Sequence, residues 1–574
     1  MRSWYSIDKP YQENPQIIMD KIVIYQIFTR LFCNNKAGNI YNGSIEENGC
    51  GKLNYFDESV LETIKKQGVT HIWFTGLIAH ASRTDYSRYG IPTSHPATVK
   101  GNAGSPYAIR DYFDIDPDLA VNVRCRMSEF TNLVDRVHNA GMKFIMDFVP
   151  NHVAREYQSI KKPKKYDGLG ENDNRNYHFD KDNNFYYMPG ERLAGAIDWN
   201  GYIEEPAKAT GNDRFDAYPN LFDWYETVKL NYGVDYSNHT HHFDPIPDTW
   251  IKMRDILLYW AEKGVDAFRC DMAEMVPVEF WHWAIESVKN TYPNIIFIAE
   301  IYNPGAYTSY TEYGHFDYLY DKVGLYDTLR AVTVGSQSAT AITQCWQNIG
   351  GNAEKMLHFM ENHDEQRIAS SFFAGDGKKG RPSMVVSACL DSAPVMYYAG
   401  QELGEKGMDN EGFSGTDGRS TIFDYWAPDT LSRWYKDGVL SDKHLTREEI
   451  DLKSFYNRLF NICTSEQAIS KGLFFDLMYV NPASANFDPH KEYAFIRKYQ
   501  DTLLLIVANF SDTMQRSQIT IPEHAFNYLD IRTKGRTTAI ELFTGQEYEI
   551  DLQADTAINV QIPENGATIL KIKV

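Results

Sequence analysis

The sequence lacks any long apolar run. Nowhere in its 574 residues does a stretch approach the roughly 18 apolar residues that cross a bilayer. Residues 1–15 contain no apolar core of the kind found in export signals. We therefore expect no membrane insertion and a cytoplasmic location, or a periplasmic or secreted one if an export signal has been removed.

Positive charge and paired cysteines are also scarce. The chain has 77 Asp and Glu but only 57 Lys and Arg, a net charge of −20. This charge repels phosphate backbones and argues against nucleic acid as a partner. The seven cysteines are an odd number without a Cys-x-x-Cys pair, which favours a reducing compartment. A loop disulfide between Cys33 and Cys50 stays open as a minor alternative, since spacing alone does not fix geometry.

Aromatic residues, in contrast, are abundant at 14% of the chain, and many lie beside Asp or Asn, as in residues 198–202 and 222–225. Stacking faces next to hydrogen-bond acceptors suit sugars, although ordinary half-buried packing explains such clusters equally well.

Eight short apolar runs recur in the first four hundred residues, and helical patterns follow most of them. They are residues 22–28, 69–77, 143–149, 265–271, 295–300, 316–321, 355–361 and 395–400. Near-continuous apolar strands that alternate with helices are typical of a parallel sheet covered on both faces. Eight of them predict an α/β fold, the (β/α)₈ TIM barrel.

Two further regions differ from this pattern. The interval between the third and fourth strands is long, irregular and rich in Asn, Asp, Tyr, Gly and Pro, which indicates a functional excursion rather than disorder because it holds many aromatics. From residue 472 onward, alternating runs predict a C-terminal antiparallel β-sandwich. The predicted division is barrel at 1–152, inserted subdomain at 153–247, barrel at 248–471 and sandwich at 472–574.

Acidic side chains stand at the ends of three predicted strands. Asp271 ends the fourth strand, Glu300 ends the fifth, and Asp364 follows the seventh. The active site of such barrels lies at the C-terminal strand ends, so these carboxyls should converge. A single acid there is more often structural, but three acids with two histidines and an arginine indicate a catalytic site.

Paired carboxyls are what glycoside hydrolysis requires: one attacks or stabilises the anomeric carbon, and the other protonates the leaving oxygen. Arg269 lies two residues before Asp271 and therefore on the same face of the strand. We expect its charge to keep Asp271 ionised and to lower the pKa of that carboxyl.

Four segments carry a more specific signal. They are DFVPNH (147–152), GVDAFRCDMAE (264–274), IFIAE (296–300) and FMENHD (359–364). In sequence and order they resemble the signature segments of the α-amylase family of glycoside hydrolases, family 13. The resemblance extends over the whole chain, because that family also has a barrel, an insertion after strand three and a C-terminal sandwich.

The resemblance implies roles for individual residues. Asp271 would be the nucleophile that forms a covalent glycosyl-enzyme, Glu300 the general acid and base, and Asp364 the third acid, with retention at an α-linkage. The residues implied to bind sugar are Tyr107, His152, Arg269 and His363, and Asp147 is implied to support the site from beneath.

The chain also departs from the family pattern. Glu274 and Met275 replace the Lys-His pair of many α-amylases, which puts one usual calcium contact in doubt. Asn151 matches the family's calcium ligand, yet calcium needs about six or more oxygens. Structural calcium at Asn151 remains a prediction, and no cofactor is expected for the chemistry. Arg367 is expected to pair with a neighbouring acid rather than with sugar.

The leading prediction is a retaining hydrolase of α-1,4-linked glucans or maltooligosaccharides. An α-glucosidase, a glucan transferase or a trehalose-forming isomerase would use the same site. A non-catalytic sugar-binding relative is disfavoured because all three acids are present. Oligomeric state is left open.

Overall fold

Eight parallel strands form a closed barrel in the computed structural model, which describes residues 21–164, 166–532 and 535–574. Around the barrel their order is β1-β16-β15-β14-β13-β12-β5-β2. Their bounds are β1 Val23–Phe28, β2 His71–Thr75, β5 Lys143–Phe148, β12 Ala267–Cys270, β13 Ile296–Ala299, β14 Tyr318–Tyr320, β15 Met356–Phe359 and β16 Val395–Tyr398. Each strand falls within one of the eight predicted runs, and the TIM barrel is confirmed.

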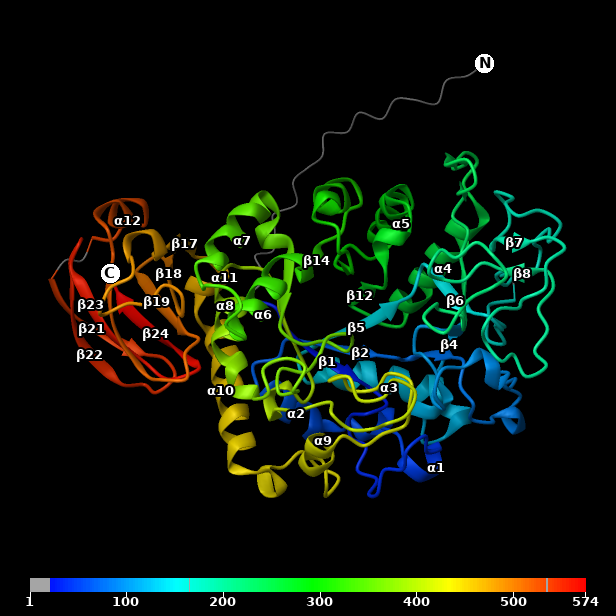
Figure 1. The fold of residues 1–574 in the computed structure, drawn as a ribbon, viewed down its shortest axis with the longest axis horizontal. Coiled ribbons are helices and arrows are strands. Elements are labelled where there is room, and N and C mark those ends of the chain that lie inside the picture. Colours follow the sequence, from blue (N-terminus) through cyan, green and yellow to red (C-terminus); the bar gives the residue numbers. More distant parts are fainter. Residues whose placement is uncertain (1–20, 165, 533–534) are drawn as a thin grey trace, which may run out of the picture.

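Helices cover the outside of the barrel (Figure 1). The main ones are α2 Glu58–Lys65, α3 Arg126–Asn139, α4 Asp248–Glu262, α5 Val278–Thr291, α6 Asp327–Thr333, α7 Ala341–Ile349, α8 Arg381–Cys389 and α10 Arg447–Ser465. Helix α3 buries Phe130, Leu133, Val134 and Val137, the apolar stripe that its sequence spacing predicts. Because both faces of the barrel sheet are covered, every residue of β1, β2, β12, β15 and β16 is buried.

The excursion after β5 is a small subdomain held by three short antiparallel pairs. They are β6 His152–Ala154 with β9 Thr227–Lys229, β7 Tyr187–Met188 with β8 Ala207–Lys208, and β10 Val234–Asp235 with β11 Thr240–His241. It has its own apolar cluster, which includes Tyr186, Trp199 and Tyr225. In Figure 1 the subdomain and the C-terminal sheet lie at opposite ends of the molecule.

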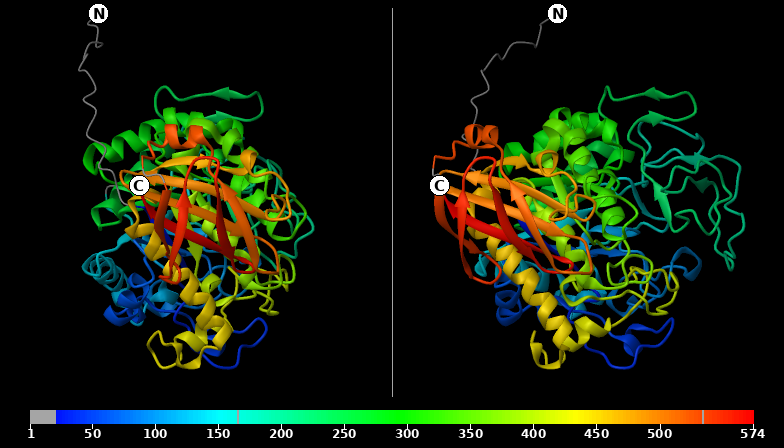
Figure 2. Two further views of the ribbon diagram at one scale, coloured as in Figure 1. Left: turned by 90° about the vertical axis from the view of Figure 1, so that its left-hand side faces the viewer. Right: turned by 60° about the vertical axis from the view of Figure 1, so that its left-hand side comes forward.

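The C-terminal region forms antiparallel sheets (Figure 2). One has six strands in the order β17 Leu473–Asp476, β18 Glu492–Tyr499, β19 Thr502–Asn509, β24 Gly566–Lys573, β21 Gly535–Glu541 and β22 Glu547–Leu552, and the other pairs β20 Gln515–Thr520 with β23 Ala557–Ile562. Strand β23 contacts β22 and β24, so the two sheets lie against each other. Helix α8 packs on β19 and β24, which fastens this region to the barrel.

Two of the simpler expectations concern the membrane and the cysteines. Among the described helices, none has the length and apolar character needed to cross a membrane. Residues 1–15, where no export-type core was expected, lie outside the described residues. All seven cysteines are within the described ranges and free, so Cys33 and Cys50 form no disulfide.

Candidate active site

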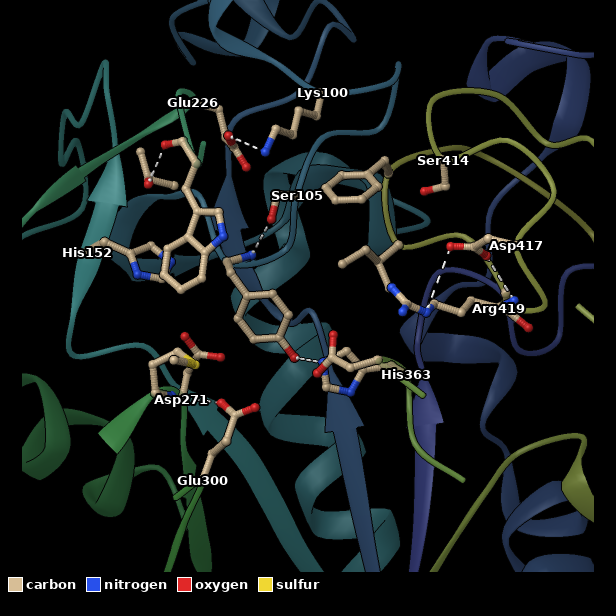
Figure 3. A pocket seen from close by; sticks show the side chains of 18 of the residues that line it. Lys100, Ser105, His152, Glu226, Asp271, Glu300, His363, Ser414, Asp417 and Arg419 are labelled. Carbon is tan, nitrogen blue, oxygen red and sulfur yellow. Dashed lines mark hydrogen bonds and ion pairs between the residues drawn. The ribbon is translucent and has the colours of Figure 1, made fainter. Parts of the chain in front are cut away.

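A pocket of about 350 Å³ opens at the C-terminal ends of the barrel strands (Figure 3). Three parts of the chain line it: the barrel, the inserted subdomain and the loop that follows β16. Their labelled residues in Figure 3 include Asp271, Glu300 and His363 from the barrel, His152 and Glu226 from the insertion, and Asp417 and Arg419 from the loop. The structure therefore brings the predicted acids and histidines to one cavity.

Arg269, on β12, joins three of the acids. Its Nη1 atom donates to Asp271 Oδ1 at 2.8 Å and to Asp147 Oδ1 at 3.3 Å. Its Nη2 atom lies 2.8 Å from Glu300 Oε2, an ion pair without hydrogen-bond alignment. The guanidinium is fully buried, and Tyr320 Oη accepts a hydrogen bond from its Nε at 3.1 Å. One cation thus fixes the relative positions of three carboxyl groups.

The pKa of Asp271 differs from the expectation. Burial raises this pKa well above its ordinary value, Arg269 lowers it in part, and the nearby carboxyls of Glu300 and Asp147 raise it further. Arg269 thus lowers this pKa as predicted, but the expected net lowering is wrong, because burial and the other acids outweigh the contribution of Arg269.

Glu300 is held by donors from the turn after β12 and from its own loop. The backbone N–H of Met272 donates to Oε2 at 2.8 Å, and the Tyr302 hydroxyl donates to Oε1 at 2.5 Å. Met272 has φ of +43°, the left-handed region that few non-glycine residues adopt. Tyr302 was missed from the sequence, although its spacing of two residues from Glu300 offered a signal.

Asp364 differs from Asp271 in that its surroundings favour the ionised form. Its Oδ2 atom lies 3.0 Å from His363 Nε2, which also contacts the Tyr107 hydroxyl. Burial would raise the pKa of Asp364, but His363, Arg269 and Arg419 outweigh it and lower the pKa to about 2. Gln26 Nε2 lies 2.8 Å from His363 Nδ1 and fixes the ring from the other side.

His152 brings the inserted subdomain to the pocket. Its ring centroid lies 5.2 Å from that of Trp224, and burial, with Lys229 and Lys100 nearby, lowers the pKa of His152 to about 3. A Cβ at Gly211 would lie only 2.9 Å from His152 Cβ, so this approach requires glycine. His152 is therefore a neutral imidazole at the wall of the pocket.

Asn151, the predicted calcium ligand, has other partners. Its Oδ1 atom accepts a hydrogen bond from Lys229 Nζ, and its Nδ2 donates to Gly211 O at 2.8 Å. A lysine ammonium directed at this oxygen does not fit a calcium ion bound there. In the described ranges, no group of three or more His, Cys, Asp or Glu residues is arranged to hold a metal.

One polar pair at the wall of the pocket was not predicted. Lys100 Nζ lies 2.9 Å from Glu226 Oε2 and joins a barrel loop to the insertion across one wall. Neither residue belongs to a sequence motif, and they are far apart in the chain. The prediction for Arg367 is confirmed, because its Nη1 lies 2.9 Å from Glu361 Oε2.

Comparison with known proteins gives matches along most of the chain. Alpha-amylase 2 of Dictyoglomus thermophilum is 22% identical over 511 residues, covering 86% of this chain and 70% of that protein. Neopullulanase 2 of Thermoactinomyces vulgaris is 22% identical over 549 residues, covering 92% of this chain and 74% of that protein.

Solved structures give a similar result. The maltogenic alpha-amylase AmyB from Thermotoga neapolitana has a TM-score of 0.63 at 18% identity, covering 97% of this chain and 100% of that one. The alpha-amylase of Geobacillus thermoleovorans has a TM-score of 0.60 at 16% identity, covering 97% of this chain and 98% of that one. At such low identity these structures show the shared fold alone.

A family model identifies the family of the chain. The model of the alpha-amylase catalytic domain matches residues 26–451, nearly the whole barrel with its insertion. The chain therefore belongs to the α-amylase family of glycoside hydrolases, family 13.

Proposed function

We propose that this enzyme hydrolyses α-glucosidic bonds of α-1,4-glucans or maltooligosaccharides with retention of configuration, through a covalent glycosyl-enzyme on Asp271. The observation that carries the proposal is the contact of Arg269 with both Asp271 and Glu300. Two carboxyls bridged by a single guanidinium lie close together. This favours the separation of about 5 Å used by retaining enzymes over the wider one, about 6.5–9.5 Å, that admits a water molecule in inverting enzymes.

The first step breaks the glycosidic bond. Asp271 must be ionised to react, and the Arg269 guanidinium favours that state against the effect of burial. A carboxylate oxygen of Asp271 then attacks the anomeric carbon from the face opposite the leaving group and forms a glycosyl ester. Glu300 gives its proton to the departing glycosidic oxygen, so that the leaving sugar departs with a neutral hydroxyl. Arg269 and the Met272 N–H hold the two reacting carboxyls in position.

The second step releases the sugar. Glu300, now ionised, removes a proton from water, and the resulting oxygen attacks the anomeric carbon and displaces Asp271. Two inversions at the same carbon give net retention. Throughout, Asp364 stays ionised and accepts hydrogen bonds from sugar hydroxyls, and the neutral His152 forms hydrogen bonds without adding charge.

The substrate class follows from the pocket and from the relatives. Tyr107 and Trp224 line the pocket together with carboxylates and imidazoles, a composition suited to sugar rings. Relatives along most of the chain are named alpha-amylases and a neopullulanase. α-Glucans and maltooligosaccharides are the substrates consistent with both observations.

Azide rescue of two variants tests the assigned roles. Glu300→Ala should lose hydrolysis of maltooligosaccharides but regain turnover of an aryl α-maltoside in azide, giving the α-maltosyl azide. Asp271→Ala should instead give the β-azide, because azide then attacks in a single inversion. Asp182→Asn, an exposed acid of the insertion, is the matched control and should leave the kinetics unchanged. Full hydrolytic activity in Asp271→Ala would overturn the proposal.

A further inference from the structure

Lys229 lies at the junction between the inserted subdomain and the barrel. It is the last residue of β9 and pairs in register with His152 of β6. Lys229 is only 2% exposed. The ammonium donates to Asn151 Oδ1 and, at 3.2 Å, to the backbone carbonyl of Met275. It also lies 2.6 Å from Asp213 Oδ1.

These three oxygens come from separate parts of the chain. Asn151 follows β5, Asp213 belongs to the insertion, and Met275 lies four residues after Asp271 in the turn that follows β12. Asp213 Oδ1 is buried and accepts no hydrogen bond from the described residues, so the ammonium is the charge that compensates it. The three oxygens therefore surround one cation, the ammonium of Lys229.

A calcium ion does not fit at this point. Calcium binds six to eight oxygens at about 2.3–2.6 Å, whereas the oxygens identified here are directed at a nitrogen atom. The Tyr236 ring centroid, 5.8 Å from Nζ, contributes an aromatic face to the same ammonium. An aromatic face attracts an ammonium group, but it has no oxygen atom that could bind a calcium ion.

We propose that the ammonium of Lys229 is the structural cation of this junction, so that the enzyme fastens its insertion to the barrel without a bound divalent metal. The contacts of Lys229 also affect the pocket, because His152 lines it. Asn151 directly precedes His152, and Lys229 pairs with His152 between β9 and β6. Burial lowers the pKa of Lys229, and the Asp213 carboxylate opposes this lowering. The inference concerns stability and metal content, and it does not depend on the proposed reaction.

The wild-type enzyme provides the first test. After dialysis against EDTA and then metal-free buffer, elemental analysis should find no stoichiometric calcium. The thermal unfolding midpoints in EDTA and in excess CaCl₂ should coincide. One calcium ion retained per chain, or a midpoint lowered by EDTA, would overturn the proposal.

A double-mutant cycle then tests whether Lys229 and Asp213 act together. Lys229→Met removes the ammonium but keeps an unbranched chain of nearly the same length, and it should lower the midpoint by about 5 °C. Combining it with Asp213→Asn should cost less than the sum of the single losses, because both remove the same interaction.

Lys208→Met is the matched control. It removes another lysine of the insertion, which contacts Glu204 and the Arg155 carbonyl rather than Asp213, and its effect should be additive with that of Asp213→Asn. Additive losses for Lys229→Met and Asp213→Asn, or an unchanged midpoint in Lys229→Met, would contradict the inference.

Discussion

The hydroxyl of Tyr302 donates a hydrogen bond to Glu300 Oε1 at 2.5 Å. The two residues lie on one short segment after β13, and the contact orients the carboxyl proposed as proton donor. Tyr302→Phe removes this donor without changing the ring. We expect kcat to fall about ten-fold with little change in KM, since a hydrogen bond to a charged group contributes about 1.5–3 kcal/mol.

Tyr307→Phe is the control for that variant. Its ring is buried nearby in the chain, and its hydroxyl has no hydrogen-bond partner among the described residues. Steady-state kinetics on one maltooligosaccharide should show wild-type kcat for Tyr307→Phe. If Tyr302→Phe also retained wild-type kcat, the positioning role would be wrong.

Replacing Arg269 with lysine should impair catalysis. Lysine keeps the charge but cannot contact Asp271 and Glu300 with two fixed nitrogens. We expect kcat for Arg269→Lys to fall on the order of 100-fold, because small displacements of reacting groups are costly. Arg254→Lys, on α4 beside Asp255 and Trp283, should leave kcat unchanged. Near-normal turnover in Arg269→Lys would show that the bridge is dispensable.

Trp224 should affect substrate binding more than the chemical step. It lines the pocket beside His152 and contacts neither Asp271 nor Glu300 through a hydrogen bond. Trp224→Ala should raise KM about ten-fold with a small change in kcat, because a stacking face for sugar is lost. Phe222→Ala, at a side chain 97% exposed two residues away, should leave KM unchanged. A fall in kcat at constant KM would contradict a binding role.

His358 should give the enzyme a pH-dependent stability. On β15 it lies 2.9 Å from Asp391 Oδ2 and 3.1 Å from Asp321 Oδ2. Burial lowers the pKa of His358, but these carboxylates outweigh it and raise the pKa to about 9. The folded-state pKa exceeds the unfolded value of about 6.5, so the stabilisation is complete below that pH and is lost as pH rises through 9.

The corresponding experiment compares the wild type with His358→Gln by urea unfolding. The wild type should lose on the order of 3 kcal/mol between pH 6.5 and pH 9 that the variant does not lose. Equal pH dependence of the two proteins would show that His358 is not the titrating group.

The barrel and the positions of its acids could be predicted because they depend on local sequence. The run 22–28 is apolar except for Gln26, and it forms β1 because both faces of that strand are buried. Asp271 and Glu300 converge because they follow neighbouring parallel strands whose C-terminal ends share one side of the barrel.

Other features depend on contacts between distant segments. Lys229 ends the short strand β9 of the insertion, 78 residues from Asn151, and neither periodicity nor a motif marks it. The pKa of Asp271 was predicted in the wrong direction because sequence spacing shows Arg269 but shows neither burial nor the other carboxyls. Such quantities become predictable only when the packing is known.

The central claim is catalysis by Asp271 and Glu300 with a covalent intermediate, and the stereochemistry of the product tests it most directly. Proton NMR of maltoheptaose hydrolysis, recorded before mutarotation, resolves the anomeric configuration of the first reducing ends formed. Retention at an α-linkage predicts that the α-anomer appears first and then equilibrates with the β-anomer. Initial formation of the β-anomer would contradict the account.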